Sequence, residues 1–342
     1  MSKATTDDPS LAALGASARV VSLPLTTRFR GIAVREVMLF DGPAGWAEWG
    51  PFVEYEAAES ARWLAAAIEA GWGDWPTPVR ATIPVNAIVP AVPPAEAARL
   101  VQDSGGCRTA KVKVAEPGQT LDDDVARVAA VRRALDELGV GGRVRVDANG
   151  AWTVIEALDA VRELSPFGLE YVEQPCATLA DLARLRRLVD IPVAVDEGVR
   201  KAADPDAVAG LREAADVVIV KVAPLGGVKR ALRVAERAGL PAVVSSALDS
   251  SIGLAAGAAL AAALPQLPYA CGLGSGRLLD RDIVTDRVLP DEGVIRVGRR
   301  IPAPSLVEFA AAEPERVQWW HRRLESTYRA LVESQLVGPG SR

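Results

Sequence analysis

Hydrophobic and polar positions alternate with two different periods along most of this chain. From about residue 83 onward, short runs of β-branched residues are separated by stretches in which Ala, Leu, Arg and Glu recur at helical spacing. The runs predict eight strands, at residues 83–88, 109–114, 144–147, 169–173, 193–196, 217–222, 242–245 and 269–272. Helices are predicted between them, among them 122–138, 154–164, 179–188, 228–238 and 254–264.

Eight strands alternating with helices predict one parallel sheet. This is the number of strands at which such a sheet closes, so we expect an α/β fold of the (β/α)7β type, a modified TIM barrel. A doubly wound open sheet is the alternative. It would call for a Gly-rich phosphate loop after its first strand, and no G-x-G-x-x-G follows residue 88.

The two ends of the chain have a different pattern. Residues 18–25 and 31–39 predict strands, 45–50 extends them as a hairpin, and 56–70 predicts a helix, which together indicate a small α+β unit. After the eighth run, 280–297 returns to strand and turn character, and a terminal helix is expected at 314–336. We therefore expect an N-terminal α+β capping domain at 1–82, the barrel at 83–276, and a C-terminal segment at 277–342 that completes the capping domain.

Ionisable side chains end five consecutive predicted strands. In a barrel the C-terminal strand ends meet at one mouth, where the chemistry of this fold takes place. The intervals from Asp147 to Glu173, on to Asp196 and on to Lys221 are 26, 23 and 25 residues, each about one βα unit. The side chains concerned are Lys111 and Lys113, Asp147, Glu173, Asp196, and Lys221.

The three carboxylates predict a metal site. Asp147, Glu173 and Asp196 would stand side by side, where unpaired carboxylates repel one another unless a cation lies between them. Hard oxygen ligands favour Mg²⁺, with Mn²⁺ as an acceptable substitute. A single strand-end Asp is often only a helix N-cap, so the inference depends on all the positions together.

The two lysines of the second predicted strand belong to the same mouth. Lys111 and Lys113 are two residues apart, so their side chains share one face of the strand, which is the barrel interior if Val112 and Val114 face the helices. Two ammonium groups in a barrel interior need anions close by.

Composition narrows the class of partner. The 342 residues carry a net charge of −5 with 49% apolar residues and no long basic run, which argues against binding to nucleic acid or to an acidic membrane surface. We expect a small-molecule substrate and no obligate protein partner.

Cys107, Cys176 and Cys271 lack zinc-ligand spacing and are expected to be buried thiols. The N-terminus lacks the apolar core of a signal peptide and no segment has the length of a membrane span, so we expect a cytoplasmic location.

The strand-end residues also resemble a known family. Lys111-Val112-Lys113, Asp147-Ala148-Asn149, Glu173-Gln174-Pro175, Asp196-Glu197 and Lys221 are similar to the K-x-K, D-x-N, E-Q-P, D-E and K motifs of the muconate-lactonizing-enzyme subgroup of the enolase superfamily. The resemblance covers nearly the whole chain. These motifs are specific to the subgroup and much less specific to one reaction.

Within the subgroup, the triplet 145–147 and the serine-rich run 245–253 resemble the o-succinylbenzoate synthase family of the actinobacterial type. This implies a hydro-lyase of menaquinone biosynthesis, which performs the Mg²⁺-dependent syn-dehydration of 2-succinyl-6-hydroxy-2,4-cyclohexadiene-1-carboxylate. N-succinylamino acid racemase and muconate cycloisomerase are alternatives, as is a non-catalytic barrel that binds a small acid. A dipeptide epimerase would carry an acidic pair at 271–276, which is absent, and a His/Asp dyad is excluded because His321 is the single histidine and lies in the terminal helix.

The resemblance implies a role for each candidate residue. Lys113 would be the base, Lys221 would stabilise charge from the opposite side, and Lys111 would lower the pKa of Lys113. Arg145 and Asn149 would support the metal ligands. Segments 26–31 and 49–52 would close the mouth as a lid. The residues expected to bind the substrate are Arg28, Ser245, Ser246, Ser250, Ser251, Gly253, Gly272 and Gly274.

Overall fold

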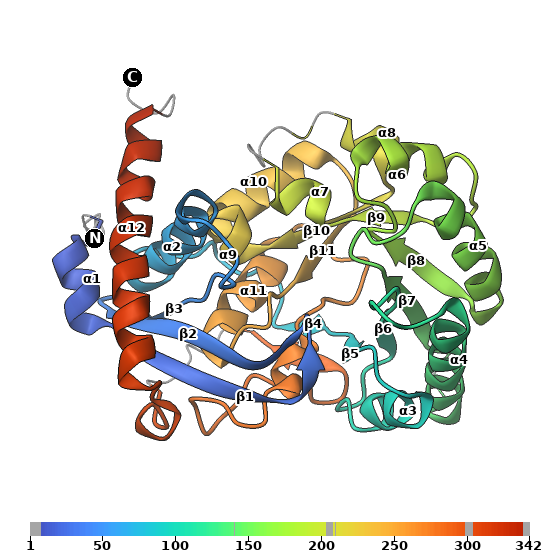
Figure 1. The fold of residues 1–342 in the computed structure, drawn as a ribbon, viewed down its shortest axis with the longest axis horizontal. Helices are drawn as coiled ribbons and strands as arrows, with labels where there is room; N and C mark the ends of the chain where they lie inside the picture. Colours follow the sequence, from blue (N-terminus) through green and yellow to red (C-terminus); the bar gives the residue numbers. More distant parts are fainter. Residues whose placement is uncertain (1–7, 140, 203–207, 209, 298–303, 338–342) are drawn as a thin grey trace.

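A curled parallel sheet surrounded by helices forms most of the molecule, with a smaller layer of long strands and an upright terminal helix at one side (Figure 1). This computed structural model describes residues 8–139, 141–202, 208, 210–297 and 304–337. Residues 1–7 lie outside the described residues. They include most of the N-terminal segment for which the sequence predicted no signal peptide.

The central sheet has seven parallel strands whose spatial order follows the chain. The strands are rich in valine and are buried on both faces, as expected of a parallel sheet covered by helices. Val112, Val146 and Val172, for example, are completely buried. The strands are β5 (Ala87–Val89), β6 (Thr109–Lys113), β7 (Arg143–Asp147), β8 (Leu169–Glu173), β9 (Val193–Val195), β10 (Val217–Lys221) and β11 (Ala242–Ser245).

Helices connect each strand to the next and cover the outside of the sheet (Figure 1). Two of them begin with a capping box, in which Thr120 pairs with Asp123 and Thr153 pairs with Glu156, so these starts are fixed by local sequence. The connecting helices are α3 (Pro94–Gln102), α4 (Leu121–Glu137), α5 (Val154–Leu164) with η1 (Ser165–Phe167), α6 (Leu179–Arg186), α7 (Glu197–Arg200), α8 (Leu211–Ala214), α9 (Val222–Leu225), α10 (Val228–Ala238) and α11 (Ser251–Ala263).

The sheet closes into the predicted (β/α)7β barrel, but its eighth strand is minimal. The prediction of a strand at 269–272 is too long, because only Cys271 and Gly272 pair, through single parallel bridges to Val85 and Ser245. Pro268 has no N–H group to donate to a ladder. Closure depends on short backbone bonds, from Cys271 N to Pro84 O at 2.7 Å and from Gly272 N to Val244 O at 2.7 Å.

The predicted strand 83–88 is also wrong as a continuous element. It divides into β4 (Thr82–Pro84), which pairs antiparallel with β12 (Val294–Arg296), and β5, which begins the barrel. At the division Val85 N donates to Gly293 O and Asn86 N donates to Cys271 O, so consecutive residues pair with different partners. The alternation of apolar residues is the same in both pieces, which is why the division is not visible in the sequence.

The N-terminal unit is an antiparallel meander of β1 (Arg19–Phe29), β2 (Ile32–Gly42) and β3 (Gly45–Trp49), preceded by α1 (Leu11–Ser17) and followed by α2 (Ala57–Trp72). The strands β1 and β2 are longer than predicted. Their tip is the two-residue turn Arg30-Gly31, in which both residues have positive φ, as primed hairpin turns require.

The C-terminal segment runs back along the N-terminal unit. After η2 (Gly274–Leu278) and η3 (Glu308–Ala310), α12 (Pro314–Val337) packs against α2 (Figure 1). Trp320 is fully buried there; its ring lies edge-on to Trp49 at 5.4 Å, and its Nε1 donates to Glu36 at 3.1 Å. We therefore propose the division into a capping domain at 1–82, the barrel at 83–276 and a C-terminal segment at 277–342 that completes the capping domain.

The three cysteines are buried free thiols, as predicted. Among the described residues, none of the helices combines the length and the apolar character that crossing a membrane would need.

The packing of α12 gives a first testable prediction. Trp320→Ala should lower the free energy of unfolding by about 3–5 kcal/mol, because it leaves a large cavity and removes a hydrogen bond to Glu36. The neighbouring half-buried His321 is the matched control, and His321→Ala should cost less than about 1 kcal/mol. Urea denaturation followed by circular dichroism measures both. Equal effects of the two substitutions would contradict an integral role of α12 in the capping unit.

Candidate active site

The register of the parallel strands stacks the candidate side chains in layers at the barrel mouth. Lys113 pairs with Asp147, and Asp147 pairs with Glu173 on the next strand. Asp196 follows directly after β9, and Lys221 is the last residue of β10. Because residues two apart on a strand share a face, Lys111 lies one layer below Lys113. The structure thus brings together all six strand-end residues that the sequence singled out.

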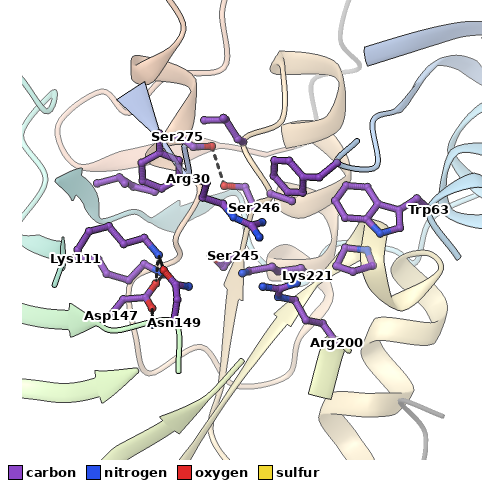
Figure 2. A pocket seen from close by; sticks show the side chains of 17 residues that line it. Arg30, Trp63, Lys111, Asp147, Asn149, Arg200, Lys221, Ser245, Ser246 and Ser275 are labelled. Carbon is purple, nitrogen blue, oxygen red and sulfur yellow. Dashed lines mark hydrogen bonds and ion pairs between the residues drawn. The ribbon is translucent and has the colours of Figure 1, made fainter. Parts of the chain in front are cut away.

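Ion pairs join these residues in two groups. Lys111 Nζ lies 3.1 Å from Asp147 Oδ2 and 2.7 Å from Glu173 Oε1, and Lys113 Nζ lies 2.6 Å from the same Asp147 oxygen. Lys221 Nζ lies 2.5 Å from Asp196 Oδ2. Figure 2 shows Lys111 and Asp147 on one side of the cavity and Lys221 on the other. The lysines therefore supply much of the positive charge that the three carboxylates need.

The environments of the two β6 lysines push their pKa values apart. For Lys111 burial alone would lower the pKa, but Glu173 and Asp147 outweigh it, and the pKa stands well above its ordinary value. For Lys113 burial lowers the pKa, Asp147 opposes this, and the charge on Lys111 lowers it further, so the net direction is downward. This downward shift agrees with the expectation that Lys111 lowers the pKa of Lys113. A lowered pKa favours the neutral amine that a general base needs.

The carboxylates respond in opposite ways to the same burial. Burial raises the pKa of Glu173 to about 7, and the charge of Asp147 contributes to the rise. Burial would also raise the pKa values of Asp147 and Asp196, but the nearby lysines, joined at Asp196 by Arg200, outweigh it and hold both below their usual range. Asp147 and Asp196 are therefore firmly anionic, while Glu173 needs additional positive charge to be so at neutral pH.

The carboxylates offer two unpartnered oxygens to a divalent metal ion, but they are not gathered into a three-ligand cluster. Two of their buried oxygens accept no hydrogen bond, Glu173 Oε2 and Asp196 Oδ1, although Arg200 Nε lies 3.2 Å from the latter. Buried acceptors without partners are costly, and anionic oxygens are the ligands that hard divalent cations prefer. Within the described ranges no group of three or more His, Cys, Asp or Glu side chains is drawn together as a metal cluster, and Lys111 Nζ lies between Asp147 and Glu173.

Apolar side chains from both units form the wall of the cavity above this charged layer. Arg30, which follows β1, contributes a guanidinium to the same cavity (Figure 2). The charged residues are thus supplied mostly by the barrel, whereas both units supply the apolar wall. The apolar lining residues are Phe29, Phe52, Trp63, Ile88, Pro224, Ala247 and Leu248.

Arg200 is a lining residue that sequence reasoning missed. It lies on α7, pairs with Glu197 at 2.5 Å and with Asp196 at 3.2 Å, and its Nη1 donates to Tyr55 of the capping unit at 3.1 Å. Burial opposes its charge, but Asp196 and Glu197 raise its pKa above the ordinary value. The i, i+4 spacing from Asp196 to Arg200 was a signal that could have found it.

The predicted substrate-binding serines fall into two groups. Ser245 and Ser246 line the cavity, and Ser246 Oγ donates to Gly272 O at 2.8 Å and lies 2.8 Å from Ser275 Oγ, a lining residue that was not predicted (Figure 2). Ser250 and Ser251 do not line the cavity, and α11 begins at Ser251, three residues earlier than predicted.

The structure contradicts the expected role of Ser250 and Ser251 in binding the substrate, because both hydroxyl groups already have acidic partners. Ser250 Oγ donates to Glu48, and Ser251 Oγ donates to Asp282 at 2.7 Å. Gly253 also lies away from the cavity, and a Cβ there would come within 2.9 Å of Glu48.

Arg28 is likewise not among the lining residues. It is exposed on β1, and the lining guanidinium is that of Arg30 at the hairpin tip. The sequence suggested a loop at 26–31, whereas the strand continues to Phe29 and the turn begins only at Arg30. Gly272 and Gly274 do not line the cavity either; Gly272 closes the barrel, and a Cβ at Gly274 would meet Asn86 O at 2.5 Å.

The two residues expected to support the ligands differ in position. Asn149 N donates to Asp147 Oδ1 at 3.1 Å, and Asn149 Oδ1 accepts from Lys113 Nζ at 2.6 Å, so it contacts both. Arg145 lies one layer lower, where it donates to Glu170 at 2.6 Å and to Ala270 O at 2.8 Å. Arg145 therefore links β7 to β8 and to the segment just before Cys271. It has no hydrogen bond to a candidate metal ligand.

Comparisons with known proteins agree with the fold described above. The family described as enolase C-terminal domain-like matches residues 94–302, and that described as enolase N-terminal domain-like matches residues 20–71. A Thermobifida fusca protein named o-succinylbenzoate synthase is 60% identical over 94% of this chain and 99% of its own length. A Mycobacterium tuberculosis protein of the same name is 51% identical over 95% of this chain and 98% of its own length.

Solved structures show the same fold at low identity. Muconate lactonizing enzyme from Pseudomonas putida superimposes with a TM-score of 0.70 at 19% identity, over 86% of this chain and 98% of that one. The L-Ala-D/L-Glu epimerase from Bacillus subtilis gives a TM-score of 0.70 at 22% identity, over 82% and 95% of the two chains. Together with the two family matches, these similarities confirm what the strand-end motifs indicated: this chain belongs to the enolase superfamily.

Proposed function

We propose that this chain catalyses the syn-dehydration of 2-succinyl-6-hydroxy-2,4-cyclohexadiene-1-carboxylate to o-succinylbenzoate, a step of menaquinone biosynthesis. The observation that carries the proposal is the 60% identity, over almost the full length of both chains, to a protein named o-succinylbenzoate synthase. The ion-paired lysines around one cavity support it, since they offer proton transfer and charge stabilisation in the same place.

Lys113 is the proposed base. As a neutral amine it takes the proton from the ring carbon next to the carboxylate, and the electron pair of that C–H bond is delocalised into the carboxylate. The ring hydroxyl then leaves, and Lys113 returns its proton so that the departing group is water. The ring becomes aromatic and Lys113 becomes a neutral amine again. One residue serves both steps because both groups leave from the same face.

Lys221 is proposed to act through its charge. It ends β10, on the side of the cavity opposite Lys111 and Asp147 in Figure 2, where an ammonium can stabilise negative charge that spreads over the ring. Arg200 holds Asp196, to which Lys221 is paired, and thereby fixes this side of the site.

Enzymes of the enolase superfamily typically use a divalent metal ion. We propose that the ion here is Mg²⁺, for which Mn²⁺ can substitute, and that Asp147, Glu173 and Asp196 would hold it. The chemistry supplied by the bound ion is stabilisation of the second negative charge that the substrate carboxylate gains as the α-proton leaves. The cytoplasmic location and the absence of an obligate protein partner stay predictions from the sequence.

The metal proposal predicts that EDTA abolishes activity and that added Mg²⁺ or Mn²⁺ restores it. Titration of Mg²⁺ into the metal-free protein should release heat in a saturable isotherm by calorimetry. Glu173→Gln should weaken that isotherm, because an amide oxygen carries no charge and Glu173 Oε2 is one of the unpaired buried oxygens. Full activity in a rigorously metal-free sample would contradict the proposal.

A racemase of N-succinylamino acids is the second candidate, because lysines on opposite sides of a cavity also suit removal and return of a proton on opposite faces. Muconate cycloisomerase is a further alternative in the same subgroup. We expect kcat/KM for dehydration to exceed that for any N-succinylamino acid. A racemase value at least about tenfold higher, equivalent to about 1.4 kcal/mol of barrier, would overturn the dehydratase assignment and leave the superfamily intact.

Unequal roles of the two lysines give a further prediction. Lys113→Ala should remove essentially all turnover. Lys221→Arg keeps a positive charge but cannot readily act as a base, so it should retain more dehydratase activity than Lys113→Arg and lose any racemase activity. Steady-state rates of both arginine variants at equal metal saturation decide this. If Lys113→Arg were the more active, Lys221 would be the base.

A further inference from the structure

Arg35 on β2 is a charged side chain buried at the seam between the capping unit and the barrel, with only 2% of its surface exposed. It does not line the active-site cavity. Burial lowers the pKa of Arg35 below its ordinary value, and the nearby charges of Glu48 and Asp249 oppose this shift without cancelling it. A cation buried so completely needs well-placed acceptors, and the location of those acceptors indicates its role.

The guanidinium of Arg35 joins two segments that are remote in sequence. Its Nε donates to Leu248 O at 3.2 Å, in the segment that follows β11. Its Nη2 donates to Gly50 O, just after β3. The same group lies over the ring of Phe52, with 4.6 Å between its central carbon and the ring centroid. The planar guanidinium of Arg35 thus contacts the segment after β11, the loop after β3 and the ring of Phe52.

Both segments end at the cavity wall. Phe52 and Leu248 are lining residues, one from each unit. Leu248 has φ +63°, a left-handed conformation that a leucine adopts only when its surroundings hold it. Gly50 permits the close approach on the other side, because a Cβ there would lie 2.7 Å from Arg35 Nη2. Arg35 therefore contacts both lining residues, Leu248 through its carbonyl oxygen and Phe52 through its ring.

A second buried arginine has a different role. Arg323 of α12 donates to Pro51 O at 3.2 Å, Phe52 O at 2.6 Å and Tyr55 O at 2.8 Å. It anchors the capping loop to the terminal helix, with no hydrogen bond to the barrel segment at Leu248 among the contacts of the described residues. Arg35, in contrast, donates to one backbone carbonyl on each side of the seam, Gly50 O in the capping unit and Leu248 O after β11.

We propose that Arg35 is a positioning residue that sets the separation of Phe52 and Leu248 and thereby the affinity of the site for the ring of its substrate. The inference rests on the proposed function. An apolar wall contacts the ring in the bound substrate and in the transition state alike. Its loosening should raise KM and leave kcat nearly unchanged, whereas loss of folded protein would lower the apparent kcat at constant KM.

The test is Arg35→Lys, which keeps the charge but not the fork. We expect KM for the cyclohexadiene carboxylate to rise about tenfold with kcat within about threefold of the parent enzyme, and the Kd of o-succinylbenzoate measured by calorimetry to rise in parallel. The matched control is Arg80→Lys. Arg80 donates to Ala261 O and Leu264 O, both at 2.6 Å, and does not line the cavity, so its KM should be unchanged.

A folded Arg35→Lys protein with unchanged KM and Kd would overturn the inference. If this variant did not fold while Arg80→Lys did, Phe52→Leu would decide: the same rise in KM supports the wall as an affinity determinant held by Arg35, and an unchanged KM rejects it. Failure of the proposed function has a different signature, because the parent enzyme itself would then neither turn over this substrate nor bind o-succinylbenzoate.

Discussion

The site depends on Lys111, an ammonium group buried between two carboxylates inside the barrel. It is 5% exposed and lies within 3.1 Å of both Asp147 and Glu173, so three charges that would each be costly alone stabilise one another. This arrangement raises the pKa of Lys111, and the resulting fixed charge contributes to the lowered pKa of Lys113 one layer above. A permanent cation beside a lysine with a lowered pKa is the physical basis for the proposed base.

The strand-end residues could be predicted from the sequence because their positions depend on two regular quantities. The interval of about one βα unit places them on neighbouring strands, and the two-residue period of a strand decides which side chains face inward. Register errors of one residue would have turned Lys111 away from Asp147. The same regularity explains why the barrel class was confirmed while its irregular parts were not: β4 and β5 form one apolar run in the sequence but pair with different partners.

The substrate-facing predictions failed where contacts between remote segments decide the outcome. Whether Arg28 or Arg30 reaches the cavity depends on where the β1–β2 turn falls, and a two-residue turn with an arginine at positive φ has a weak sequence signal. Ser250 was expected to bind the substrate, but its hydroxyl group donates to Glu48, which lies 202 residues earlier. No local pattern links these two positions, since their contact exists only after the capping unit has packed on the barrel.

This contrast separates two physical tasks within one cavity. The paired lysines and carboxylates are supplied by barrel strands, whose ion pairs would be disrupted by small shifts of register, whereas Phe52 and Leu248 contribute apolar wall at the junction of two units. Changes at the junction can therefore alter which ring or side chain fits while the lysines and carboxylates keep their geometry. Arg35 lies at this junction rather than in the charged layer, so it can act on affinity without touching the reacting atoms.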